Sequence, residues 1–308
     1  MPLLIIALAI GLLLVLVIAL RVNAFLALII VALGVGLAQG MAPVEVVQSI
    51  QEGVGSTLGY LALILGLGAM LGGLVADSGG ARQITSRLID SFGIRNIQWA
   101  AVLTGFIVGL PLFYTVGFVM LVPVIFTIVR STGLPLLYVA IPTVASLSVT
   151  HGFLPPHPAP TAISVIYEAD ITLTLLYGLI LAVPTIIIAG PIFARTLKKL
   201  EASPPEHLFR ERELPEKLPS FGLALFTALI PVLLMALAAL SKLTLPEENS
   251  LRAIASFAGD PVMALLIAVL IAVYTLGTRT GRTMGEVMNS CSEAVQSIAM
   301  ILLIIGAG

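Results

Sequence analysis

Residues 97–129 read IQWAAVLTGFIVGLPLFYTVGFVMLVPVIFTIV and contain no charged side chain. A bilayer core of roughly 30 Å takes about 20 apolar residues of α-helix, so this run is too long for one simple crossing. Gly109-Leu110-Pro111 and Pro123 interrupt the run, and proline disrupts helical hydrogen bonding. The run therefore predicts two half-length helices.

The rest of the chain is similarly apolar. Of its 308 residues, 59% are hydrophobic and 10% are charged, and the mean hydropathy is +1.13. A soluble domain has about 25% charged residues, so the composition predicts an all-α, polytopic integral membrane protein. The net charge of −1 excludes a nucleic-acid binder with a basic surface, and the single cysteine, Cys291, cannot form an internal disulfide.

Eight further apolar runs predict the other crossings. Only Arg21-Val22-Asn23 separates the first two runs, which predicts a tight antiparallel hairpin. The N-terminus lacks a basic segment and a convincing cleavage site, so we interpret it as a retained first helix and not a signal peptide. The runs cover residues 3–20, 24–39, 57–76, 134–149, 171–194, 220–240, 261–276 and 294–308.

Basic residues predict the orientation. By the positive-inside rule they place residues 77–96 and the charged linker at 196–218 in the cytoplasm, and the N-terminus outside. The chain between these two segments must then cross an even number of times. It does so if 97–129 is a re-entrant hairpin, 134–167 crosses as one interrupted helix and 171–194 crosses back. The basic residues are Arg82, Arg87, Arg95, Arg195, Lys198 and Lys199.

Two polar segments look like copies of each other. Residues 45–54, EVVQSIQEGV, align with residues 286–295, EVMNSCSEAV, at an offset of 286 − 45 = 241. Internal duplication is typical of secondary transporters, although chance similarity of two amphipathic connectors is the alternative. Residues 41–56 lack Lys and Arg whereas Arg279 and Arg282 accompany the second copy, which places the copies on opposite sides of the membrane.

The repeat predicts the domain organisation. Residues 1–195 form a first repeat of five crossings plus the hairpin, 196–218 a cytoplasmic linker, and 219–308 an incomplete second repeat of three crossings. A complete second copy would end near residue ~435, so we expect the chain to be truncated at its C-terminus.

The interruptions themselves are candidate binding elements. Residues 109–117, GLPLFYTVG, and residues 146–161, SLSVTHGFLPPHPAPT, combine helix-breaking residues with hydroxyl and imidazole groups. Non-helical chain at membrane depth is tolerated only where it faces protein or a watery cavity, and the unpaired N–H groups at such breaks suit a carboxylate. The alternatives are a proline-kinked helix for the first segment and an ordinary external loop for the second.

From their positions in these segments we predict the site residues. The substrate-binding candidates are Tyr114, Thr115, Ser148, Thr150, His151, His157 and Thr161. The proton-coupling candidates are His151, His157 and Asp77, although a structural hydrogen-bonding role is the commoner one for such histidines. The sequence has no metal-ligand spacing, so we expect neither a metal nor a cofactor.

Two further segments indicate packing. Gly68 and Gly72 form a Gly-x-x-x-Gly, which indicates close helix packing, and residues 81–90 are typical of a short amphipathic surface helix.

Several motifs together resemble one family. They are THGFLPPHP at 150–158, LGAMLG at 67–72 followed by DSGGA at 77–81, and GLPLF at 109–113. The chain resembles the gluconate permease family of bacterial inner-membrane sugar-acid symporters, which is similar to the wider ion transporter superfamily with its inverted repeats. The resemblance implies import of gluconate or a related sugar acid together with protons, through a multi-pass inner-membrane protein that is not an enzyme.

Other functions stay open at this point. The substrate could be another small hydroxy acid or D-serine, and a passive anion channel would give flux without accumulation. A membrane-embedded enzyme is disfavoured because no activated nucleophile or metal triad is present. A homo-oligomer stays open too, since lipid-facing and helix-facing apolar surfaces look alike in sequence.

Overall fold

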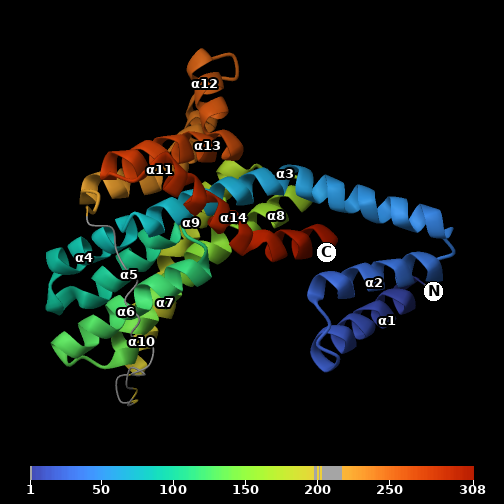
Figure 1. Cartoon of the computed structure of the whole chain (residues 1–308), viewed down its shortest axis with the longest axis horizontal. Coiled ribbons are helices and arrows are strands. Elements are labelled where there is room, and N and C mark those ends of the chain that lie inside the picture. Colours follow the sequence, from blue (N-terminus) through green and yellow to red (C-terminus); the bar gives the residue numbers. More distant parts are fainter. Residues whose placement is uncertain (1, 198–199, 201, 203–216) are drawn as a thin grey trace. The chain divides into compact units, whose positions relative to one another are not determined.

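The computed structural model describes residues 2–197, 200, 202 and 217–308, and the predicted linker at 196–218 lies largely outside them. The described residues form helices joined by short turns, without a strand (Figure 1). Eight of these helices are long and apolar enough to cross a membrane. The prediction of an all-α polytopic membrane protein is therefore confirmed.

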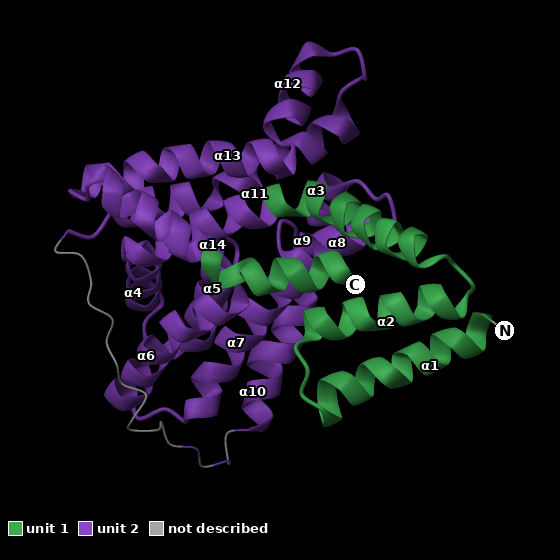
Figure 2. Ribbon diagram, turned by 45° about the vertical axis from the view of Figure 1, so that its right-hand side comes forward, with its two compact units in different colours: residues 1–63, 296–308 green, residues 64–295 purple. Residues whose placement is uncertain are grey.

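The chain divides into two compact units (Figure 2). Unit 1 comprises residues 2–63 and 296–308. In it, α1 (Pro2–Leu14), extended by the π-turn Val15–Ala19, packs against α2 (Ala24–Ala38) as the predicted hairpin. The Asn23 side chain accepts a hydrogen bond from the Phe25 N–H at 3.0 Å and so caps α2. Unit 1 also contains the first part of α3 (Pro43–Asp77) and the last part of α14 (Met284–Ala307).

Unit 2, residues 64–295, contains the remaining helices and all the predicted site residues. Its helices are α4 (Gly80–Phe92), α5 (Ile97–Gly109), α6 (Tyr114–Thr132), α7 (Leu136–Phe153), α8 (Pro158–Ile166), α9 (Ile171–Ile187), α10 (Phe193–Thr196), α11 (Phe221–Thr244), α12 (Ser250–Ala258) and α13 (Pro261–Ala272).

The predicted start of α3 was wrong. The helix begins at Pro43, not at residue 57, so the polar segment that we took for a connector is helical. Proline suits the first helical position, and the Glu45 carboxylate accepts from the Ala42 N–H at 3.0 Å. At 1.5 Å per residue the 35-residue helix is about 52 Å long, which exceeds the thickness of a bilayer core.

Helix α4 is amphipathic as predicted, but its apolar face is buried and not exposed at the surface. Ile84 and Leu88 are buried, and the helix packs against α5 and α11. Protein side chains therefore cover the face that we had assigned to the membrane surface.

Helices α5 and α6 form a hairpin beside α7. The Gln98 side chain at the start of α5 donates to the Tyr138 carbonyl near the start of α7, and Gly109 packs against Thr150 near the end of α7. Helix α6 then returns, because Gly117 packs against Leu147 and α7 begins four residues after α6 ends. Both ends of the hairpin thus lie near the start of α7, and its turn lies near the C-terminus of α7.

Local contacts recur 241 residues apart. The polar segments at 45–54 and 286–295 begin their helices with equivalent hydrogen bonds, and the preceding glycines pack on equivalent valines. The pairs are Ala42 N–H to Glu45 and Thr283 N–H to Glu286, Gln48 to Glu52 and Asn289 to Glu293, and Gly36 against Val46 and Gly277 against Val287. Gly40 and Gly281 also share a positive φ, at 90° and 93°. The similarity of the two segments therefore extends from sequence to local structure.

Candidate functional site

The two interruptions meet in unit 2. We call residues 110–113, between α5 and α6, the hairpin tip, and residues 154–157, between α7 and α8, the helix break. The His157 Nε2 lies 2.8 Å from the Gly109 carbonyl oxygen. The Phe113 ring stands edge-on to His151 and His157, with centroids 6.0 and 6.2 Å away. The tip of one element is therefore fastened to the break in the other.

A histidine pair occupies this junction. The Nδ1 atoms of His151 and His157 are 3.2 Å apart, which is hydrogen-bond distance. His157 is 5% exposed whereas His151 is partly exposed, and the Tyr114 ring lies 6.3 Å from the ring of His151. The structure thus brings three of the predicted residues together.

Helix α3 closes the junction from another side. A Cβ atom at Gly72 would lie 2.6 Å from the Pro111 carbonyl oxygen, so only glycine permits this approach of the tip. Of the Gly-x-x-x-Gly, it is therefore Gly72 that packs α3 against the hairpin tip, since nothing lies within 4 Å of a Cβ at Gly68. The cavity at the junction leaves about 10 Å³ that the centre of a water molecule can occupy, which is room for about one water. Its lining includes Gly68, Phe113, Pro156, His157, Pro231 and Leu265.

The start of α8 has fewer donors than we expected. The first N–H groups of a helix have no intrahelical acceptor, but Pro158 and Pro160 have no N–H to offer. The Thr161 N–H donates to the His157 carbonyl, which leaves only the Ala159 amide in the first turn. The expectation of several free amides at this break was therefore wrong, because the prolines that break the helix also remove its donors.

The start of α6 is richer in donors. Tyr114, Thr115 and Val116 all carry amide N–H groups, and the first intrahelical bond of this helix is from Gly117 N–H to Phe113 O. Three amides at the hairpin tip therefore lack an intrahelical acceptor, next to the positive end of the helix dipole.

The predicted hydroxyl residues differ in their surroundings. Thr150 is buried and donates to the Ser146 carbonyl at 2.8 Å, so helix backbone already satisfies its hydroxyl. Thr161 is 0% exposed, and its hydroxyl has no hydrogen-bond partner among the described residues. Thr115 and Ser148 are exposed. A buried hydroxyl without a partner is costly, which makes Thr161 the strongest of these ligand candidates.

Asp77 does not contact the histidine pair through any of the interactions described here. It ends α3 five residues beyond Gly72, about 7.5 Å along the helix axis, and interacts electrostatically with Cys291 of α14.

Sequence reasoning also missed the Gly109 carbonyl and Phe113, since a backbone acceptor and an apolar ring give no polar signal. Among the described residues no cluster of metal-ligating side chains occurs.

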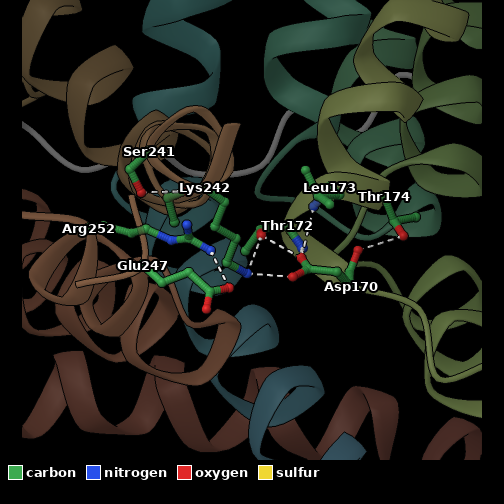
Figure 3. A network of polar contacts seen from close by, with 9 residues as sticks. Asp170, Thr172, Leu173, Thr174, Ser241, Lys242, Glu247 and Arg252 are labelled. Carbon is green, nitrogen blue, oxygen red and sulfur yellow. Dashed lines mark hydrogen bonds and ion pairs between the residues drawn. The ribbon is translucent and has the colours of Figure 1, made fainter. Parts of the chain in front are cut away.

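A polar network joins α9 and α11 (Figure 3). Asp170 caps α9 by accepting from the Thr172 and Leu173 N–H groups, and its carboxylate pairs with Lys242 at 2.5 Å. Partial burial alone would raise the pKa of Asp170. The hydrogen bonds from Lys242, Thr172 and Leu173 and the lysine charge outweigh it and lower the pKa to about 2. The carboxylate is therefore ionised at neutral pH and links residues on the two sides of the linker.

Comparisons with known proteins agree with the motifs. Residues 1–308 match the family described as GntP family permease. The chain is 54% identical over 309 residues to the high-affinity gluconate transporter of Escherichia coli (strain K12), and 53% identical over 313 residues to the Gnt-II system L-idonate transporter of that strain. It is 46% identical over 322 residues to the gluconate permease of Bacillus subtilis (strain 168).

These alignments cover 100% of this chain and 70%, 70% and 71% of the respective relatives. The described helices are those of a polytopic membrane protein, and the matches extend over the whole chain. The chain belongs to the GntP family of permeases, which are transporters and not enzymes.

Proposed function

We propose that this permease imports gluconate or a related sugar acid together with protons, and that the substrate binds where the hairpin tip meets the helix break. The family makes it a multi-pass protein of the bacterial inner membrane. The observation that carries the site is the contact of His157, in the helix break, with the Gly109 carbonyl at the end of α5, directly before the hairpin tip. The names of the E. coli and B. subtilis relatives favour gluconate and L-idonate as substrates.

The chemistry of the two segments suits a polyol carboxylate. Three amides and the positive dipole end of α6 stabilise the carboxylate, because aligned N–H donors favour anions at helix N-termini. The hydroxyls of Tyr114 and Thr161 and the His151 ring match the substrate hydroxyls. Thr115 and Ser148 are assigned to the route by which substrate reaches this junction.

Substrate entry requires the junction to open. A cavity with room for about one water cannot hold a six-carbon acid, so tip and break must separate before binding. A ligand shifts such an equilibrium only if it binds one state more tightly than the other. In this proposal, substrate and proton shift the equilibrium between the open and closed states of the small interface that the tip, the break and α3 form.

The repeat supplies the membrane arrangement. In the proposal, 1–195 and 219–308 are inverted copies joined by the cytoplasmic linker 196–218, with the N-terminus outside and α5–α6 re-entrant. The hydrogen bonds that recur at an offset of 241 support this arrangement. Helix α5 has 13 residues and is about 20 Å long, which also favours a re-entrant element over a crossing.

Uptake of labelled gluconate into cells that express the permease tests the function. We expect accumulation above the external concentration that collapses when an uncoupler removes the proton gradient. Flux without accumulation would favour a passive channel. Accumulation that the uncoupler does not reduce would contradict proton coupling. Competition with L-idonate, D-serine and small hydroxy acids then ranks the substrates.

A further inference from the structure

We infer that His151 and His157 together hold one exchangeable proton, which enters and leaves at Nε2 of His151, and that His157 is a positioning residue. This inference rests on the proposed function, since it names the group that carries the proton. According to this inference, the pair binds and releases one proton and does not conduct protons across the junction.

The hydrogen-bond partners determine the protonation pattern of His157. A carbonyl oxygen can only accept, so the His157 Nε2 that lies 2.8 Å from Gly109 O must carry a hydrogen. In the neutral ring the other nitrogen, Nδ1, then has a lone pair and can only accept. His157 is thus the Nε2–H tautomer.

The pattern of His151 follows from that of His157. Its Nδ1 lies 3.2 Å from the His157 lone pair and must donate, which leaves the lone pair of neutral His151 on Nε2. This Nε2 has no hydrogen-bond partner among the described residues, and the His151 residue is partly exposed. An added proton therefore finds one available atom in the pair.

A second added proton is excluded by geometry. Placing it on His157 Nδ1 would set two N–H groups against each other across 3.2 Å, between two charged rings. The proton also cannot pass through His157, because its Nε2–H points to a backbone carbonyl that does not take up protons. The pair therefore holds at most one proton in this conformation, and the proton leaves by the atom at which it entered.

The surroundings contain few other titratable groups. Helices α5, α8, α9 and α13 contain no Asp, Glu, Lys or Arg, and α9 contributes only the exposed Tyr177. Tyr114 of α6 faces His151 at 6.3 Å. The charges on the other packed elements are Arg130 near the far end of α6, Lys242 near the end of α11, Arg195 of α10, Asp77 at the end of α3, and Glu45 and Glu52 in the first part of α3.

Protonation strengthens the junction while the pair is closed. A charged imidazolium is a stronger donor than a neutral ring, so the His151–His157 bond tightens and His157 holds Gly109 more firmly. The same charge favours a nearby substrate carboxylate. A substrate carboxylate bound beside the pair therefore favours its proton, and the proton favours the substrate, which predicts one proton per substrate.

Matched variants separate the two histidines in uptake assays. In His157→Gln the amide N–H can donate to Gly109 O and the amide oxygen can accept from His151, so we expect slower uptake that keeps one proton per substrate. In His157→Ala both bonds are lost, and we expect uptake at least tenfold below that of His157→Gln. In His151→Gln, whose side chain can still hydrogen-bond a substrate hydroxyl, we expect proton uptake and accumulation to be lost while substrate exchange slows but stays measurable. Loss of proton uptake in His157→Gln, or its retention in His151→Gln, would overturn the inference.

Nitrogen NMR of the ¹⁵N-histidine-labelled permease reads the proton site without transport. The chain has three histidines, and the single variants assign the signals. We expect the Nδ1–H tautomer at His151 and the Nε2–H tautomer at His157, with only His151 gaining a second proton as the pH falls. If this pattern is found but uptake ignores the proton gradient, proton coupling fails and the proton site stands. Titration of His157, or the opposite tautomers, contradicts the assignment.

Discussion

The hairpin tip and the helix break are both four residues long, yet they offer different groups. The tip is followed by Tyr-Thr-Val, so α6 starts with three amides that have no intrahelical acceptor, whereas Pro-Ala-Pro leaves one such amide at the start of α8. The break compensates with a histidine ring and the buried hydroxyl of Thr161. Two interruptions of the same length can therefore have different roles. In the proposed site, the tip binds the substrate carboxylate, and the break provides the proton and the contacts with substrate hydroxyls.

The largest effect is expected where the tip touches α3. Gly72→Val would place side-chain atoms into the Pro111 carbonyl, which a Cβ alone would approach to 2.6 Å. We expect uptake of labelled gluconate to fall more than tenfold at equal amounts of protein in the membrane. Gly66→Val is the matched control, since nothing lies within 4 Å of a Cβ there. Equal uptake by the two variants would show that the contact has no role.

Exchanging the proline pattern tests the division between tip and break. Val116→Pro removes one amide at the start of α6 at a position in the first turn that proline tolerates. A hydrogen bond to a charged group contributes about 1.5–3 kcal/mol, so we expect KM for gluconate to rise roughly tenfold or more. Pro160→Ala adds an amide at the start of α8, and we expect an unchanged or about threefold lower KM. If Pro160→Ala has the larger effect, the carboxylate lies at the break instead.

Removal of the Thr161 hydroxyl should weaken binding without loss of stability. Thr161→Val keeps the shape but deletes a buried hydroxyl that has no partner among the described residues. We expect KM to rise about fivefold, as for one neutral hydrogen bond, and the unfolding temperature to stay or increase.

Thr104→Val is the control for this substitution, because its buried hydroxyl in α5 is also without a partner. It should match the effect on stability and leave KM unchanged. A raised KM in both variants would indicate a general effect of packing.

The smallest effect is expected at the ion pair between α9 and α11. Asp170 has its pKa lowered from 3.8 to about 2, so it stabilises the fold above pH 4, and this contribution is lost as pH falls through 2. Asp170→Asn should cost about 1 kcal/mol or less, because both partners are partly exposed. The difference in unfolding temperature from the unchanged protein should shrink between pH 4 and pH 2.

Glu247→Gln provides the comparison for that pair. Glu247 is 88% exposed and lies 3.5 Å from Arg252, so its removal should change neither stability nor uptake. A loss of uptake in Asp170→Asn would assign the α9–α11 link a role in transport as well.

The sequence was sufficient for the apolar helices and for the two interruptions, while the number of membrane crossings stays a prediction. Long apolar runs and clustered prolines act locally, so 97–129 divided where Gly109 and Pro111 predicted. The prediction of two half-length helices was wrong for α6, which continues through Pro123 for 19 residues. The start of α3 was wrong because a polar, amphipathic stretch can continue an apolar helix when a proline and Glu45 begin it well. A hydropathy pattern therefore locates the apolar part of a helix but does not give the full length of the helix.

The candidate site was predictable in part. Tyr114, His151 and His157 meet as their positions indicated, because helix breaks are marked by residue type. The contact of Gly109 O with His157 spans 48 residues and uses a backbone atom, so no sequence pattern could show it. The number of free amides could have been predicted, since Pro158 and Pro160 are visible in the sequence.

Thiol labelling of Thr115→Cys tests most directly whether the tip and the break form the substrate site. Cys291 is the one native cysteine and is buried, and Cys291→Ser removes it from the assay. We predict that a membrane-impermeant maleimide reacts with Cys at position 115 and that saturating gluconate slows the reaction at least fivefold. Labelling at the rate of a free thiol in water, unchanged by gluconate, would contradict the account.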